Sequence, residues 1–181
     1  MLENISQVDW NRIKQASGNA SHVPEAVKGL VSDDHSIREA AYWKLDNHIV
    51  LQSDLYEAAY YVIPFLLEIL RSDVQQGRDY VYDLLFEIAN GCAPEEVMCT
   101  YSGREIELTD ACRMAVSDEF ELYLLEVSNK SSSCREKALE LLVSVSDGIG
   151  DIKTSLSGLL LSESDSEFSG VLRDAITELD D

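Results

Sequence analysis

Hydrophobic positions follow a helical period along almost the whole chain. Apolar residues recur three, four and seven positions apart, and strict alternation of apolar and polar residues is sustained nowhere. The pattern therefore predicts an all-α fold of about eight helices after a short N-terminal one. Residues typical of first helical turns, N-caps and helix ends mark several boundaries: Pro24, Ser36, Ser133, Gly91 and Gly148.

A repeated pattern surrounds four arginines, each near the start of a predicted helix that follows another helix and a polar turn: Arg38, Arg78, Arg135 and Arg173. Three positions later the residue is always apolar, and seven positions later it is leucine except in the last copy, which has Asp180. The steps between the arginines are 40, 57 and 38 residues. Two of these steps match a helix-pair repeat of about 40 residues.

The longer step predicts an insertion between the second and third helix pairs. Its sequence, GCAPEEVMCTYSGREIEL at positions 91–108, contains a proline and two glycines and has no clear apolar period. We therefore expect an inserted loop there. Insertions between repeats often lie on a binding face, so this loop is a candidate to contact a partner.

Composition predicts one folded domain over residues 1–181, because 45% of the 181 residues are hydrophobic and 27% are charged. The formal net charge of −20 would repel nucleic-acid phosphates and anionic membranes. We therefore expect a basic protein partner, and neither a nucleic acid nor a membrane. The N-terminus has no pattern of a secretion signal and the longest apolar run is too short to span a bilayer, so we expect a cytoplasmic protein.

Candidate catalytic and metal-binding patterns are missing from the sequence. The four cysteines form no C-x-x-C pair, and the histidines at positions 22, 35 and 48 have a spacing that does not suit one metal site on one helix. No nucleophile elbow, phosphate-binding glycine loop or zinc-protease motif occurs. We therefore predict a non-enzymatic protein without a cofactor or a metal.

Three segments resemble HEAT repeats: VPEAVKGLVSDDHSIREAAYWKL, VIPFLLEILRSDVQQGRDYVYDLLFEIANG and FELYLLEVSNKSSSCREKALELLVSV. The shared features are an apolar first helix, a polar turn and a second helix that opens with arginine followed by small or apolar residues. The resemblance covers roughly residues 22–179, and it departs from the pattern at Gly77, Asn129 and Lys130. It implies a right-handed α-solenoid of about four helix pairs, similar to HEAT-domain proteins common in bacteria.

In such a solenoid the second helix of each pair lines a concave face that holds a partner. One position after each arginine stand Glu39, Asp79, Glu136 and Asp174, and five positions after stand Trp43, Asp83, Glu140 and Glu178. Seven of these eight residues are acidic, so stacked repeats would align two carboxylate rows. The first row could equally serve the helix dipoles, and both rows could be a merely solvated face.

Aromatic residues concentrate beside these acids. Six of the eight tyrosines, together with Trp43, lie between positions 42 and 82. We expect exposure for Tyr42, Trp43, Tyr56 and Tyr82, and we place Tyr82 and Glu87 at the border of the second carboxylate row. Tyrosine and tryptophan beside charges are common in binding hot spots.

The leading hypothesis is an immunity-type inhibitor that neutralises a basic toxin, such as a nuclease, through an acidic concave face. Two alternatives remain open. One is an enzyme on a HEAT-like scaffold, similar to DNA glycosylases or bilin lyases, although a glycosylase needs a basic track for phosphates. The other is an assembly scaffold or chaperone in which the acidity serves solubility alone.

Overall fold

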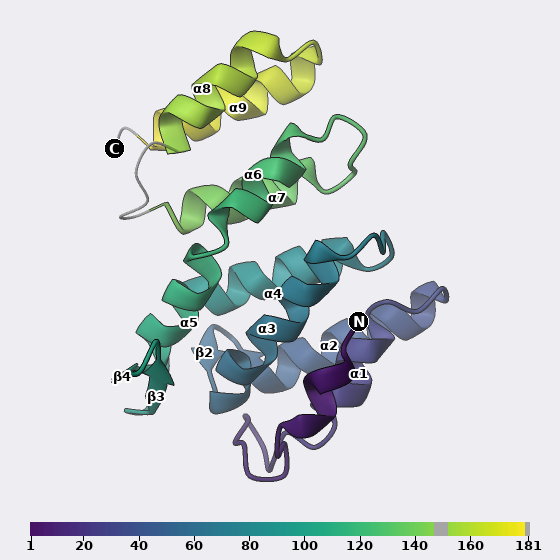
Figure 1. The fold of residues 1–181 in the computed structure, drawn as a ribbon, viewed down its shortest axis with the longest axis vertical. Helices are drawn as coiled ribbons and strands as arrows, with labels where there is room; N and C mark the ends of the chain where they lie inside the picture. The colour runs from purple at the N-terminus through teal and green to yellow at the C-terminus, as the bar shows by residue number, and fades with distance from the viewer. Residues whose placement is uncertain (147–151, 180–181) are drawn as a thin grey trace. The chain divides into compact units, whose positions relative to one another are not determined.

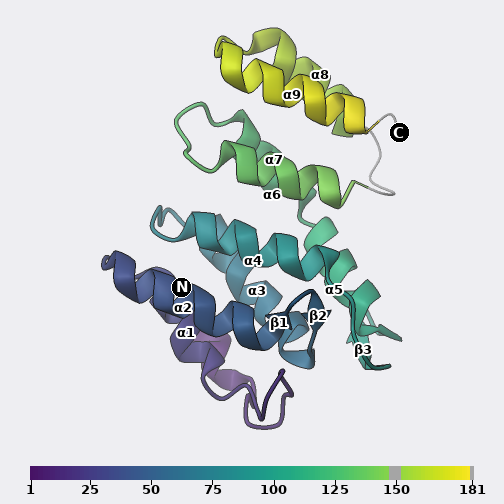
Figure 2. The ribbon, with the colours of Figure 1, turned by 180° about the vertical axis from the view of Figure 1, so that it is seen from behind.

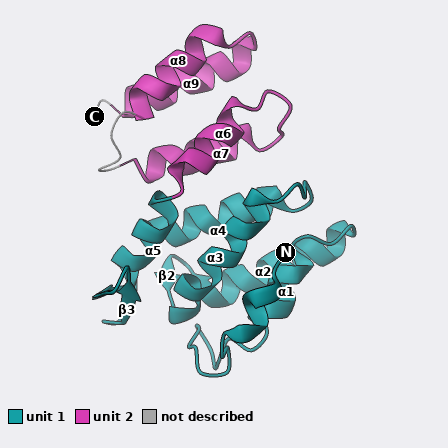
Figure 3. Ribbon diagram, in the orientation of Figure 1, with its two compact units in different colours: residues 1–118 teal, residues 119–181 magenta. Residues whose placement is uncertain are grey.

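The computed structural model describes residues 1–146 and 152–179 and is mostly helical, which confirms the all-α class (Figure 1). Gly148 and Asp180 lie outside the described residues. The chain divides into two compact units, residues 1–118 and 119–181 (Figure 3). The prediction of one domain over residues 1–181 stays a prediction.

Unit 1 contains two helix pairs in two layers. A 3-10 helix, η1 (Glu3–Gln7), precedes α1 (Val23–Gly29), α2 (His35–Ile49), α3 (Glu57–Arg71) and α4 (Arg78–Asn90), and α5 (Leu108–Ser117) ends the unit. Helix α1 packs against α2 and α3 against α4, and the second helices α2 and α4 also pack on each other. Figure 2 shows α2 and α4 side by side in front of α1 and α3. The core between the layers includes Leu45, Ile63, Leu66, Leu84 and Leu85.

The starts of two second helices differ from the prediction by one or two residues. Helix α2 is capped by Asp34, whose carboxylate accepts from the backbone N–H of Ser36 at 2.8 Å, and the Ser36 hydroxyl donates to the same carboxylate. Ser36 therefore lies inside the helix. Helix α7 (Arg135–Ser144) begins two residues after Ser133, and the hydroxyl oxygen of Ser132 accepts from the Cys134 N–H. An aspartate displaces serine as the cap of α2 because a carboxylate also suits the positive helix dipole.

Three of the four repeat arginines do the same structural work. Nη1 of Arg38 donates to the carbonyls of Ser32 and Asp33 at 2.7 and 3.0 Å. Nη1 of Arg78 donates to Leu70 O at 3.0 Å, and Nε of Arg135 donates to Val127 O at 2.8 Å. Each guanidinium thus satisfies carbonyls where the preceding helix ends, or in the turn that follows, which helical hydrogen bonding leaves unpaired.

Arg173, the fourth predicted anchor, has a different position. It is exposed and lies in the middle of α9 (Ser166–Glu178) instead of at the start of the helix. The N-terminus of α9 is capped by Asp165, which accepts from the N–H groups of Glu167 and Phe168. The prediction of a helix start near Arg173 was wrong because the apolar period runs on both sides of that arginine.

Gly77 occupies a turn whose backbone conformation and close packing require glycine. Its φ of 74° lies in the left-handed region, and a Cβ atom there would be 1.9 Å from the carbonyl oxygen of Leu30. The turn between α3 and α4 therefore passes against the end of α1 at a distance that only glycine permits.

Two β-hairpins occur where no strands were predicted. Strands β1 (Val50–Leu51) and β2 (Asp54–Leu55) form the first hairpin, and β3 (Met98–Tyr101) and β4 (Arg104–Glu107) form the second, with Met98 opposite Glu107. The second hairpin fills most of segment 91–108, so the expected inserted loop is regular structure followed by α5. Both turns have two consecutive residues with positive φ, as two-residue hairpin turns require.

Unit 2 contains α6 (Phe120–Ser128), α7, α8 (Ile152–Ser162) and α9. Helix α6 packs against α7, α8 against α9, and α7 against α9. Its core includes Tyr123, Val127, Leu142, Leu156 and Leu172.

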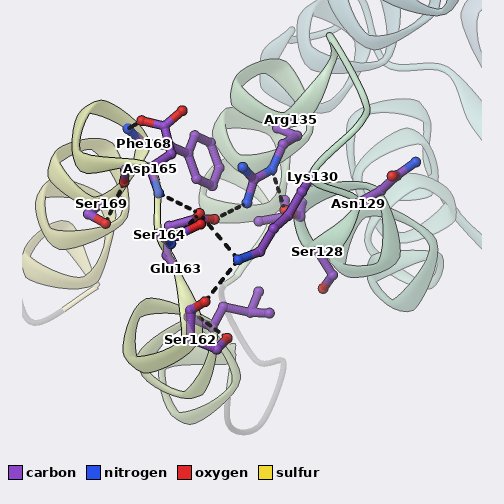
Figure 4. A network of polar contacts seen from close by, with 12 residues as sticks. Ser128, Asn129, Lys130, Arg135, Ser162, Glu163, Ser164, Asp165, Phe168 and Ser169 are labelled. Atoms are coloured by element: carbon purple, nitrogen blue, oxygen red, sulfur yellow. Dashed lines mark hydrogen bonds and ion pairs between the residues drawn. The ribbon is translucent and has the colours of Figure 1, made fainter.

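The turn between α8 and α9 is bound to the α6–α7 pair through Glu163 (Figure 4). The Glu163 carboxylate lies 2.5 Å from Nη2 of Arg135 and 3.5 Å from Nζ of Lys130, and its side chain is 3% exposed. The Arg135 guanidinium lies 3.6 Å above the centre of the Phe168 ring. Backbone N–H groups and Arg135 lower the pKa of Glu163 to about 2. This network joins the two helix pairs of unit 2.

No helix in the described ranges has the length and apolarity to cross a bilayer.

Candidate partner-binding face

The candidate site is the outer surface of α2 and α4 in unit 1. Ala41, Leu45 and Ile49 point from α2 into the core, so the opposite side of the helix faces outward. We call this surface the acidic–aromatic face; it consists of Glu39, Tyr42, Trp43, Asp46, Asp79, Tyr80, Asp83 and Glu87. Two neighbouring helices therefore contribute residues from separate repeats to one surface.

Aromatic rings connect the two helices across this face. The rings of Tyr42 on α2 and Tyr80 on α4 lie 5.1 Å apart, and the Trp43 ring meets Tyr42 edge-on at 5.0 Å. Trp43 is nevertheless 53% exposed. The Tyr80 hydroxyl lies 3.5 Å from Nε2 of His35 at the start of α2. A large exposed indole supported by other rings is the kind of anchor that interfaces use.

Three half-buried carboxylates surround Tyr42. The Tyr42 hydroxyl is hydrogen-bonded to Asp46, and burial, followed by the charges of Asp46, Asp83 and Glu87, raises the pKa of Tyr42 to about 12. Burial, together with the charges of Asp46 and Asp83, raises the pKa of Glu87. Burial also raises the pKa of Asp46. The negative charges of Asp46 and Asp83 act on Glu87, so a cation at this face would relieve that repulsion.

The structure brings five of the six site residues predicted in unit 1 to this face. Glu39, Trp43 and Asp79 are exposed, and Asp83 and Glu87 are half-buried. The expected exposure of Tyr82 was wrong, because its side chain is 1% exposed. Tyr82 lies between the inward-facing Val81 and Leu85 on α4, so its ring fills the core.

The four predicted residues of unit 2 are exposed as well. Glu136 and Glu140 lie on α7, and Asp174 and Glu178 lie on α9, which packs against α7. The two helices thus carry a second group of outward carboxylates. The alignment of all four second helices into two continuous rows stays a prediction.

Asp46 and Tyr80 are members of the face that the sequence reasoning missed. Asp46 follows Tyr42 by one helical turn, and this spacing was a usable signal. Tyr80 was not among the aromatic residues expected to be exposed, and the structure leaves it half-buried beside Tyr42. Contact between rings 38 positions apart depends on how α2 packs on α4, which periodicity does not specify.

Within the part of the chain that the structure describes, no group of three or more histidine, cysteine, aspartate or glutamate side chains is arranged to hold a metal ion. No protein-family model matches the sequence, and comparisons with characterised proteins and with solved structures found no significant match.

Proposed function

We propose that this chain is a non-enzymatic protein-binding module whose acidic–aromatic face binds a basic protein. The observation that carries the proposal is the exposed Trp43 packed against Tyr42, whose hydroxyl lies among the half-buried carboxylates of Asp46, Asp83 and Glu87. The indole supplies apolar contact area, and the carboxylates supply a negative potential that lysine or arginine side chains would neutralise.

The most concrete partner is a cationic toxin such as a nuclease, which the chain would neutralise in the cytoplasm as an immunity-type inhibitor. A nuclease needs a positive groove to bind phosphates, and an acidic surface competes for that groove. The net charge of −20 would speed the encounter of the two proteins and make it sensitive to salt. Inhibition then requires no chemistry from this chain.

We further propose that the helix pairs continue as a right-handed α-solenoid of four HEAT-like repeats. Two features support this arrangement: every pair packs within itself, and the second helices of successive pairs pack together in each unit, α2 on α4 and α7 on α9. The shared use of Arg38, Arg78 and Arg135 at helix ends supports a common repeat. In a continuous solenoid Glu140 and Glu178 would extend the acidic–aromatic face.

Affinity capture from the native host, followed by mass spectrometry, tests this function. The wild-type chain should retain one basic protein, and the gene directly upstream is expected to encode it as a larger secreted protein with a basic C-terminal domain. The variant Asp83→Lys/Glu140→Lys should lose that protein. Glu3→Lys/Glu121→Lys is the matched control, because it makes the same change in net charge, with one exposed position in each unit, away from the proposed rows.

Far-UV circular dichroism of each variant establishes that its helices are intact. Equal capture by wild type and Asp83→Lys/Glu140→Lys would contradict binding through the carboxylates. Equal loss in the control variant would show that only total charge matters, as expected for a face that is merely solvated.

A further inference from the structure

Two histidines meet beside the loop that precedes α1. His22 occupies the N-cap position of α1, and His48 lies in the last turn of α2. Their rings are 4.8 Å apart and edge-on, with an interplanar angle of 66°. The loop Gln15–Ser21 is attached to both residues, because Gln15 contacts His22 and the Ala16 N–H donates to the His48 carbonyl at 2.9 Å.

The hydrogen bonds indicate that the His22 ring is neutral. Nε2 of Gln15 donates to Ser17 O at 2.9 Å, which turns the Gln15 amide oxygen toward His22. Nε2 of His22 lies 2.8 Å from that oxygen and must therefore carry the proton. Nδ1 of His22 is left as a buried atom with no hydrogen-bond partner among the described residues. An unprotonated nitrogen tolerates that position far better than an N–H group would.

His48 uses its other ring nitrogen, Nδ1, for its hydrogen bond. Its Nδ1 lies 2.8 Å from the Lys44 carbonyl and must donate to it. His48 and Lys44, which lie beside the His22 ring, make protonation of His22 less favourable.

We propose that His22, packed against His48, forms a pH-dependent latch that holds the loop Gln15–Ser21 closed while the His22 ring is neutral and releases the loop when that ring takes up a proton. Gln15 also lines a cavity of about 690 Å³, together with segments 54–57 and 94–97. Release of the loop would therefore open one wall of that cavity.

The surroundings of His22 favour its neutral form. Burial lowers the pKa of His22 most, and His48 and Lys44 on α2 lower it further, whereas Glu25 on α1 opposes them. Glu57 on α3 accepts a hydrogen bond from the backbone N–H of Lys14 at 3.0 Å, and so fixes the chain immediately before the loop Gln15–Ser21. Because the pKa of His22 is below 6.5 in the closed loop and returns toward 6.5 in the open loop, the open form binds more protons.

The closed loop is therefore favoured above about pH 6.5 and is weakened as the pH falls from there toward the lowered pKa. Across that window the open-to-closed ratio should rise by up to about tenfold per pH unit, because His22 takes up one proton.

Hydrogen exchange of the wild-type chain tests the latch directly. Protection of the Ala16 and Ala20 amides, corrected for the intrinsic pH dependence of exchange, should fall between pH 7.5 and pH 5.5. In His22→Gln the new amide can still donate to Gln15 but cannot titrate, so protection should lose this pH dependence. His35→Gln is the matched control, because it removes an exposed histidine of the same unit and should behave as wild type.

An NMR titration of the histidine rings in the wild-type chain keeps the test decisive if a variant does not fold. The expected result is a His22 midpoint below 6.5 and the Nε2–H tautomer at neutral pH. In His48→Gln the His22 midpoint should shift upward. A His22 midpoint at or above 6.5, or loop protection in the wild type that does not change with pH, would overturn the latch.

Discussion

The buried arginine of the second repeat offers the sharpest test of how the fold is held together. Arg78 is 6% exposed, and its Nη1 contacts Leu70 O at 3.0 Å and the carbonyls of Ser72 and Val74 at 3.4 Å. Arg78→Met keeps the apolar stem and removes these bonds. One charged hydrogen bond contributes roughly 1.5–3 kcal/mol, the longer contacts less, and methionine also removes the cost of burying a charge. We expect a net loss of about 2 kcal/mol.

Urea denaturation followed by tryptophan fluorescence measures this loss, because Trp10 and Trp43, the two tryptophans of the chain, both lie in unit 1. With a slope of about 2 kcal/mol per molar, the midpoint should fall by about 1 M. Arg12→Met is the control within the same unit: the Arg12 side chain is 87% exposed and forms a surface ion pair with Asp9, so we expect a loss below about 0.5 kcal/mol. Equal effects of Arg78→Met and Arg12→Met would refute the structural role assigned to the repeat arginines.

Three further predictions concern charge and backbone conformation. Glu163→Gln should destabilise unit 2 at neutral pH. The difference in stability from wild type should shrink as the pH falls from 4.5 toward 2, because the native carboxylate itself becomes protonated there. Urea denaturation followed by circular dichroism at several pH values measures this difference. Asp46→Asn/Glu87→Gln should stabilise unit 1 at pH 7, because both carboxyl groups have raised pKa values and their ionised forms therefore destabilise the folded state. The gain in stability should shrink at lower pH in urea titrations followed by tryptophan fluorescence. A variant less stable than wild type at pH 7 would contradict this destabilising effect of the two charges. Ser53→Gly should raise stability by about 0.5 kcal/mol in thermal unfolding, because Ser53 has a φ of 68° that glycine adopts without strain.

The helices were predictable because local signals and packing agree. In α2 the apolar positions Ala41, Leu45 and Ile49 are spaced by four, and all three are buried. Arg38 lies near the start of this helix, and its importance was predictable because the same pattern of residues recurs after the other arginines. The structure adds its hydrogen bond to the Ser32 carbonyl in the preceding turn. Short-range spacing in the sequence therefore predicts the helices. It also identifies the three arginines whose side chains donate to carbonyls at or just after helix ends.

The hairpins were missed for different reasons. The turn of the first hairpin uses Gln52 and Ser53, which rarely adopt positive φ, and bonds to Cys92 hold it: Cys92 N–H donates to Ser53 O, and Leu55 N–H donates to Cys92 O. The local sequence does not predict such a turn, because the contacts that stabilise it come from Cys92, which is distant in the sequence. In the second hairpin the dipeptide Ser102–Gly103 at the turn was a signal that could have been used.

The site was only partly predictable. Spacing along α2 and α4 placed Glu39, Trp43 and Asp83 on a face away from the core, and the structure agrees. Spacing did not predict that Tyr82 is buried while the adjacent Asp83 lies on the acidic–aromatic face. The contact between Tyr42 and Tyr80, and the shared electrostatic environment of the carboxylates around them, arise from the packing of two helices and are visible only in three dimensions.

The most direct test of the central claim is a map of the bound surface. The basic protein retained by affinity capture is purified and added to the isotope-labelled chain, and backbone and indole signals are followed by NMR. We predict that the largest changes occur at the Trp43 indole N–H and at Glu39, Asp79 and Asp83 on the outer side of α2 and α4. Changes confined to α1, α3 or the β3–β4 hairpin, with the Trp43 signal unmoved, would contradict the acidic–aromatic face as the binding site.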